Sequence, residues 1–134
     1  MCLTLNSDSE IKIAEEDIIC YKILREDSEV YATSPYFGFE YIVGATYKLD
    51  KKLKIRSGDL KYEGDVKFAD EGFHSFERLE SAKAFLIIRQ GFLPAGCCVY
   101  KCIIPKGTRM ICGKFGDFSS IVSEAIIIIE KVQS

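Results

Sequence analysis

The sequence predicts a single α+β domain over residues 1–134, in which a mostly antiparallel, twisted sheet packs against one main helix near residues 76–90. Three observations predict this fold. A length of 134 residues is that of one ordinary domain. Many short segments rich in β-branched and aromatic residues are separated by Gly, Pro and polar turns, which is typical of antiparallel strands. One stretch shows apolar residues at helical spacing. We expect the sheet to be either continuous or split in two.

The N-terminal half supplies the first strands. Residues 1–15 are polar and mixed, and we expect a loosely ordered arm there. A strand is predicted over residues 17–24, because apolar residues alternate in part of this segment. Its two faces would carry Ile19, Tyr21 and Ile23 and, opposite them, Ile18, Cys20 and Lys22. Further strands are expected at residues 29–33 and 45–49, and near residues 60–62 and 66–68.

The helix is the best defined element of the sequence. Ser75 is its expected N-cap, since a serine hydroxyl can accept a hydrogen bond from an amide of the first turn. Glu77 and Glu80 follow in or near that turn, where the helix dipole favours negative charge. Gly91 is expected to end the helix. The face predicted to pack on the sheet carries Phe76, Leu79, Ala82, Phe85 and Leu86.

The C-terminal third returns to strands. A buried strand is predicted over residues 97–104, and Pro105-Lys106-Gly107-Thr108 forms a turn after it. A short extended segment at residues 109–112 and a glycine-containing loop at 113–117 come next. Residues 121–122 and 125–132 close the domain. Five successive aliphatic residues at 125–129 predict a central strand.

Composition limits the possible partners and compartment. Eighteen basic and twenty acidic residues give a net charge of −2, which disfavours nucleic acid as a partner. Neither a signal peptide nor a long apolar segment is evident, so we expect a cytoplasmic protein without a membrane partner. Six cysteines should then be reduced thiols. With one histidine and no Cys-x-x-Cys pair, the sequence predicts no metal site.

Two segments could carry a binding function. His74 and Ser75 stand just before the predicted helix, where free amides suit an anionic ligand, and His74 could donate to a phosphate or act as a general base. The alternative is a half-buried histidine bonded to a backbone carbonyl. The aromatic residues at 36–41, with Tyr31 and Tyr47, could form a stacking platform or simply fill the core. The predicted binding surface comprises Tyr36, Phe37, Phe39 and Tyr41.

Three weaker candidates remain open. Cys2 would be an N-terminal nucleophile if Met1 were removed, although a buried apolar cysteine is the ordinary alternative. A thiol of the strand 97–104 could pair with His74 if the fold brings them together. Lys106 and Arg109 flank a glycine turn and could hold phosphate, but a solvated turn is the stronger interpretation.

The order of three motifs resembles the ADP-ribosyltransferase fold. They are Ile19-Cys20-Tyr21-Lys22, Gly72-Phe73-His74-Ser75-Phe76 with Ser81-Ala82, and Ser123-Glu124-Ala125-Ile126-Ile127. The resemblance implies NAD as cofactor, held by Tyr21, His74 and Ser75. It also implies that His74 and Glu124 are the catalytic residues. Tyr21 stands where that family has a histidine or arginine, and His74 where it has a tyrosine. These departures imply an altered or inactive member.

The chain also resembles a family of small uncharacterised proteins of phages and gut bacteria. The shared features are the Met-Cys-Leu start, Gly72-Phe73-His74-Ser75-Phe76 and Ile104-Pro105-Lys106-Gly107-Thr108. That resemblance implies no activity. Our prediction is a non-catalytic binding or accessory module of phage or mobile-element origin, without a cofactor, whose partner is an unknown protein or small molecule. The alternative is the ADP-ribosyltransferase-like enzyme, which would bind a nicotinamide dinucleotide.

Overall fold

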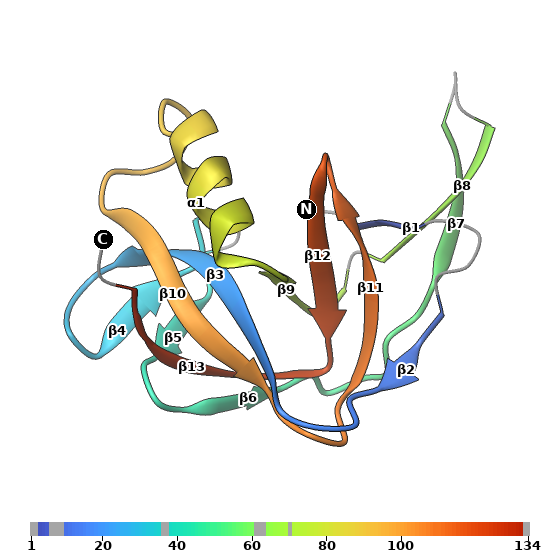
Figure 1. Cartoon of the computed structure of the whole chain (residues 1–134), viewed down its shortest axis with the longest axis horizontal. Helices are drawn as coiled ribbons and strands as arrows, with labels where there is room; N and C mark the ends of the chain where they lie inside the picture. The colour runs from blue at the N-terminus through green and yellow to red at the C-terminus, as the bar shows by residue number, and fades with distance from the viewer. Residues whose placement is uncertain (1–2, 6–9, 36–37, 61–63, 70, 133–134) are drawn as a thin grey trace.

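Antiparallel strands dominate the computed structural model, which describes residues 3–5, 10–35, 38–60, 64–69 and 71–132 (Figure 1). Within these residues, thirteen strands join one sheet, and every pairing is antiparallel. The single helix described is α1, Leu79–Ile88. The antiparallel sheet and its helix were predicted, but the small domain is richer in sheet than the predicted α+β class implies.

The strands follow one another along the chain with short connections, and α1 lies between β9 and β10. Their bounds are β1 Leu3–Leu5, β2 Lys12–Ile13, β3 Ile18–Glu26, β4 Tyr31–Thr33, β5 Glu40–Ile42, β6 Thr46–Lys48, β7 Arg56–Leu60, β8 Gly64–Ala69, β9 Phe73–Phe76, β10 Cys97–Ile104, β11 Arg109–Phe115, β12 Phe118–Ser123 and β13 Ala125–Lys131. The strand order across the sheet is β6-β13-β10-β3-β9-β12-β11-β1-β8-β7, with β2 on β11 and β4–β5 on β3.

The sheet consists of two groups of strands joined at one narrow point. The β3 group contains β3, β4, β5, β6, β10 and β13, and the β12 group contains β1, β2, β7, β8, β9, β11 and β12. Between the groups, β3 and β9 share a single register pair, Tyr21 with Phe76. By contrast, β3 and β10 pair over eight positions. The predicted sheet is therefore continuous in pairing and almost split at β3–β9; Figure 1 shows β9 between the two groups.

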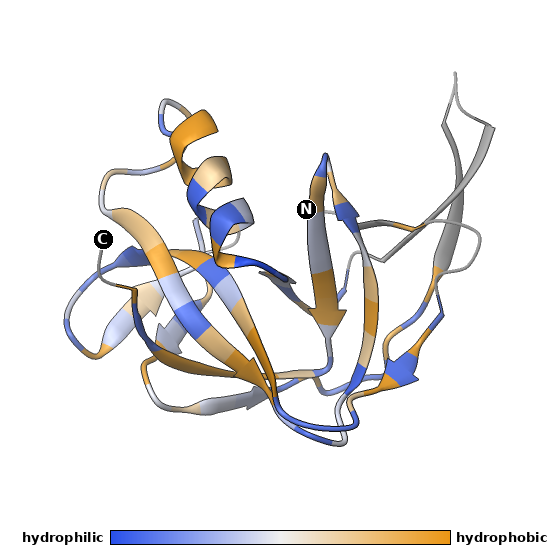
Figure 2. Cartoon of the chain, viewed as in Figure 1, coloured by the Kyte–Doolittle hydropathy of each residue, from blue (hydrophilic) through white to orange (hydrophobic). Residues whose placement is uncertain are grey.

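Alternation along β3 sorts its side chains onto two cores. Cys20 and Leu24 belong to the core on the face away from α1, together with Tyr100, Cys102, Ile126 and Ile128. Ile23 belongs to the core on the opposite face, where it packs with Val99 of β10 and with Ala82 and Phe85 of α1. The predicted faces of β3 are confirmed by this division. Figure 2 shows apolar residues along β13 and at the C-terminal end of α1.

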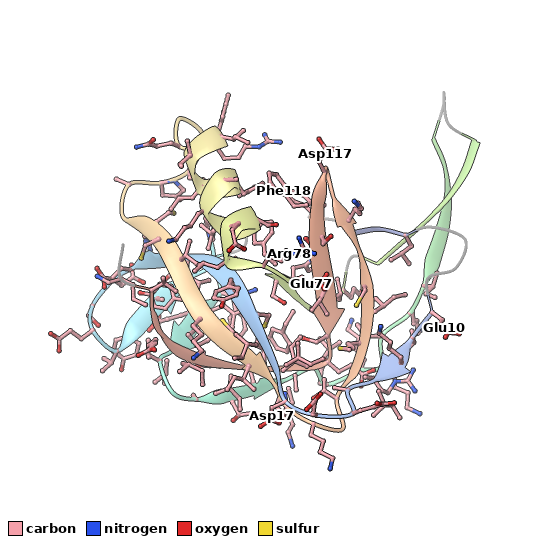
Figure 3. All side chains as sticks on the ribbon, in the orientation of Figure 1. Glu10, Asp17, Glu77, Arg78, Asp117 and Phe118 are labelled. Carbon is pink, nitrogen blue, oxygen red and sulfur yellow. The ribbon has the colours of Figure 1, made fainter. Side chains whose placement is uncertain are left out.

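Aromatic rings strengthen the narrow junction on the helix side. Phe118 of β12 reaches toward α1, where its ring centroid lies 5.9 Å from that of Phe85 (Figure 3). Phe76 lies 5.2 Å from Phe85 and 6.0 Å from Phe118. Edge-to-face and tilted pairs at these distances are favourable beyond the area that they bury. The helix thus holds the two groups of strands together where backbone pairing is sparse.

The helix begins later than predicted, because the residues before it pair in the sheet. Ser75 lies inside β9, whose residues pair with β12, and it cannot cap α1. Arg78 takes the N-cap position and makes no side-chain capping bond. At the other end Arg89 is the C-cap, so Gly91 lies beyond the terminating residue. Two predicted sheet-facing residues, Ala82 and Phe85, are the buried residues of α1.

Three further expectations differ from the structure. Part of the expected N-terminal arm is strand, because β1 pairs with β11 and β8, β2 pairs with β11, and Leu5 is buried. Strand β11 continues through Phe115 into a tight turn, where a loop was expected at residues 113–117. The aliphatic strand β13 is second from an edge rather than central, and its neighbours are β6 and β10. One face of β13 meets the core, so Ile126 and Ile128 are fully buried and Ile127 is not.

Candidate functional site

A cavity of about 570 Å³ opens where β3 and β9 separate. Small-molecule sites in proteins commonly occupy roughly 300–1,000 Å³ and are mostly apolar with a few polar groups. This cavity fits that description. Its wall includes Lys22, Phe39, Tyr41, Tyr47, Lys48, Asp50, Gly72, Phe73, His74, Ser75, Phe76 and Phe85. Residues from both cores line it, so it extends into the space between the two strands. We call it the Lys22 cavity.

The Lys22 side chain links β3 to β9 at the point where their backbones no longer pair. Beyond the Tyr21–Phe76 pair, the antiparallel register would place Ser75 opposite Lys22, but the two strands no longer pair there. The Lys22 Nζ instead donates a hydrogen bond to the His74 carbonyl oxygen at 2.5 Å. It also lies 5.6 Å from the centroid of the Tyr41 ring, within cation–π range. The amine is therefore held among groups that line the cavity.

The surroundings of Lys22 are poor in compensating charge. Among the described residues, Lys22 forms no ion pair. Burial lowers the pKa of the Lys22 amine, and only the thiols of Cys102 and Cys20 oppose this shift. Burial in turn raises the pKa of Cys20 to about 11 and also raises the pKa of Cys102. Both thiols consequently stay protonated near neutral pH and provide little negative charge.

Ser75 adds an unsatisfied hydroxyl to the same wall. The residue is only 4% exposed, and within the described part of the chain its Oγ has no hydrogen-bond partner. The hydroxyl is close enough to Cys20 to lower the pKa of that thiol, against the larger effect of burial, but not in hydrogen-bonding geometry. Buried polar atoms in folded proteins nearly always have a hydrogen-bond partner, so an exception needs an explanation, such as a site for a water, an ion or a ligand. The Ser75 hydroxyl thus marks a position where a ligand atom could accept or donate a hydrogen bond.

Aromatic rings form the outer wall of the Lys22 cavity. The ring centroid of Phe39 lies 4.7 Å from that of Tyr41 and 5.7 Å from that of Tyr47. Tyr41 lies 6.5 Å from Phe73 of β9. Phe39 is 47% exposed and lies at the mouth, whereas Tyr41 is 4% exposed and lies deeper. Burial raises the pKa of the Tyr41 phenol, so it stays neutral.

The structure brings together two sets of residues that the sequence treated separately. His74 and Ser75, expected beside a helix end, line the same cavity as Phe39 and Tyr41 of the predicted binding surface. Tyr36 and Phe37, also predicted for that surface, lie outside the described residues. Lys22 was not singled out. The available signal was a lysine among apolar residues on one face of a strand, between Cys20 and Leu24.

Tyr21 and Glu124 do not line the Lys22 cavity with His74. Tyr21 points to the opposite face of β3, where it packs on the helix-side core. The Glu124 Oε2 accepts hydrogen bonds from the Leu53 amide at 2.9 Å and from Arg109 Nε at 2.8 Å. Among the described residues, the three positions implied by the ADP-ribosyltransferase resemblance are thus not gathered in one cavity.

The remaining candidates have structural partners or lie outside the described residues. Cys2 is one of the latter. The Lys106 amide donates to the Asp17 carboxylate at 2.8 Å, so a negative charge already occupies the turn where phosphate was considered. Cys102 is fully buried opposite Cys20, and its thiol donates to the Tyr100 carbonyl at 3.6 Å. Cys97 and Cys98 of β10 are half-buried free thiols.

Comparison with protein-family models, with curated proteins and with solved structures found no match to this chain. The two resemblances described above therefore stay predictions. Across the described part of the chain, no group of three or more His, Cys, Asp or Glu side chains is placed to hold a metal ion. Within the same residues, no helix combines the length and the apolar character needed to cross a bilayer.

Proposed function

We propose that this domain binds a small aromatic molecule that carries a carbonyl or carboxylate oxygen. The observation that carries the proposal is the buried, unpartnered Ser75 hydroxyl in the wall of the Lys22 cavity, on the strand facing Lys22. Two donors without an acidic partner favour an acceptor oxygen on the ligand. The rings of Phe39, Tyr41 and Tyr47 favour an aromatic body.

The expected pose follows from the depth of each group. The ligand oxygen would lie between Lys22 Nζ and Ser75 Oγ, and its ring would extend past Tyr41 toward Phe39 at the mouth. A hydrogen bond to a charged amine contributes about 1.5–3 kcal/mol. An aromatic contact adds roughly 0.5–1.5 kcal/mol beyond the area buried. Together these contributions favour an acidic or carbonyl-bearing aromatic compound over an aliphatic one.

Isothermal titration calorimetry with 2-naphthoate tests the proposal. We expect saturable binding that weakens about tenfold in Ser75→Ala, because the ligand loses one hydrogen bond of about 1.4 kcal/mol. The same substitution should raise the free energy of unfolding by about 1 kcal/mol without ligand, since it removes a buried hydroxyl that has no partner. If Ser75 had only a structural role, its substitution would not raise the free energy of unfolding and weaken ligand binding together.

Two aromatic variants provide the matched control. Phe39→Ala removes an exposed ring at the cavity mouth, and Tyr31→Ala removes an exposed ring that does not line the cavity. Only Phe39→Ala should weaken naphthoate binding. Absence of saturable heat with the wild-type protein, or equal loss in the two variants, would contradict the proposed site.

A further inference from the structure

We infer that Lys22 is a nucleophilic amine that forms an imine with an aromatic aldehyde bound in the Lys22 cavity. The inference rests on the proposed function, because it uses the same cavity and the same aromatic wall. It adds covalent chemistry that binding alone does not require. It also names the ligand class: a carbonyl compound whose reactive carbon lies next to the Lys22 Nζ.

The geometry leaves the amine able to react. The Lys22 Nζ makes one hydrogen bond, to the His74 carbonyl oxygen. A neutral amine can donate one N–H in this way and still direct its lone pair at a carbonyl carbon. A carboxylate in an ion pair would hold the amine in its protonated, unreactive form, and among the described residues no carboxylate forms an ion pair with Lys22. Lys22 is therefore not committed to a structural salt bridge.

The environment also gives the amine a larger neutral fraction than that of an exposed lysine. Lysines become nucleophiles when desolvation lowers their pKa, because only the unprotonated amine attacks a carbonyl. Burial has this effect on Lys22. Asp50 lines the same cavity but forms no ion pair with Lys22. Among the described residues, the groups that contact the amine or act on its pKa are Cys20 on its own strand, Cys102 on β10, Tyr41 on β5 and the backbone of His74 on β9. None of these carries a negative charge near neutral pH.

The reaction balances without another reagent. The Nζ lone pair forms a bond to the aldehyde carbon, and the carbonyl oxygen takes up the proton that the nitrogen loses, which gives a carbinolamine. The carbinolamine hydroxyl then leaves as water when it is protonated, and the nitrogen loses its second proton as the C=N bond forms. Ser75 lies where its hydroxyl could hydrogen-bond the oxygen during addition. No oxidant or reductant is consumed.

Reductive trapping tests the inference in the intact protein. Incubation with 2-naphthaldehyde and sodium cyanoborohydride near neutral pH converts an imine into a stable naphthylmethyl amine, which peptide mapping by mass spectrometry assigns to a residue. Lys48 provides the internal control, since it lines the same cavity but is exposed. We expect Lys22 to be labelled about tenfold faster than Lys48.

Two variants and one competitor separate reactivity from binding. Lys22→Arg cannot form an imine, so it should lose the adduct. Lys106→Arg, a change in an exposed turn that does not line the cavity, should leave Lys22 labelling unchanged. Added 2-naphthoate should suppress Lys22 labelling in the wild type. Labelling of Lys48 at the same or a higher rate than Lys22 overturns the imine inference even where naphthoate binds. If the wild-type protein does not bind 2-naphthoate, the proposed function is instead contradicted.

Discussion

Lys22 and Arg109 are cations of the same sheet with opposite surroundings. Arg109 Nε donates to Glu124, and the same carboxylate oxygen accepts the Leu53 amide, so this charge is neutralised within the chain. Among the residues that the structure describes, the partners of Lys22 are the His74 carbonyl and the face of a ring, next to the Ser75 hydroxyl, which has no hydrogen-bond partner there. The difference indicates that the Arg109–Glu124 pair stabilises the sheet, whereas under the proposed function a ligand would supply the missing partner in the Lys22 cavity.

Gly72 lies between these two regions, and its substitution should have the largest effect. Gly72 has φ +125°, and an added Cβ would lie 2.6 Å from Val122 Cγ1 and 2.9 Å from Leu53 Cδ2. Both backbone strain and overpacking oppose a side chain there, so Gly72→Ala should lower the free energy of unfolding by about 3 kcal/mol. Urea unfolding followed by circular dichroism measures the change.

Gly107→Ala is the control for backbone strain alone. Gly107 has φ +89°, but a Cβ there would meet no atom within 4 Å. We expect a loss of about 1 kcal/mol. Equal losses in the two variants would show that the contact of Gly72 with Leu53 and Val122 is not tight.

Truncation of Glu124 should have the next largest effect, and it should act on stability alone. Glu124→Ala leaves the Leu53 amide without its acceptor and Arg109 without its partner, which we expect to cost about 1–2 kcal/mol. Because Arg109 is partly exposed, the ion pair itself contributes little of this value. Glu124→Gln keeps an acceptor for Leu53 and should lose less.

Naphthoate binding distinguishes the two regions in these variants. If Glu124 is structural, its variants should bind 2-naphthoate as the wild type does under conditions where they remain folded. A loss of affinity in Glu124→Gln with unchanged stability would instead place Glu124 in the ligand site, as the ADP-ribosyltransferase resemblance implies.

Local patterns in the sequence predicted the elements better than their positions in the sheet. The bounds of β10 agree with the predicted strand at residues 97–104, and the two faces of β3 follow from the alternation around Cys20 and Ile23. Ser75 has the residue type of a helix cap, but its pairing with Ile121 of β12 holds it in a strand. Nothing within the local sequence records that distant pairing, and the position of β13 as the second strand from an edge is hidden for the same reason.

The candidate site was predictable in parts only. The aromatic segment and His74 were identified by their residue types, and Lys22 stood visibly on an apolar face. Their convergence depends on where β3 and β9 stop pairing, which is at Phe76, a residue packed against α1, and no pattern near Lys22 marks that point. A lysine predicted on the buried face of a strand is therefore a candidate site residue even before its neighbours are known.

The pH dependence of stability tests the contrast between Lys22 and Arg109 most specifically, and its expected effect is the smallest. The pKa of Lys22 is lower in the folded protein than its ordinary value of 10.5, so the unfolded chain binds more protons between these two values. The cost of burying the charged amine is full below the lowered pKa and disappears as the pH rises to about 10.5. Lys22→Met removes this cost. Its free energy of unfolding relative to the wild type should consequently decline as the pH rises toward 10.5, as measured by urea unfolding.

Arg109→Met is the matched variant, because a guanidinium does not titrate in this range. Its stability relative to the wild type should be independent of pH, whereas that of Lys22→Met should not. The thiols of Cys20 and Cys102 interact with Lys22, so Lys22→Met also changes their pKa values, and the comparison is made at pH values below 9.0, the ordinary pKa of a thiol. A flat difference for Lys22→Met would mean that its amine is solvated in the folded protein, and the contrast between the two cations would then be lost.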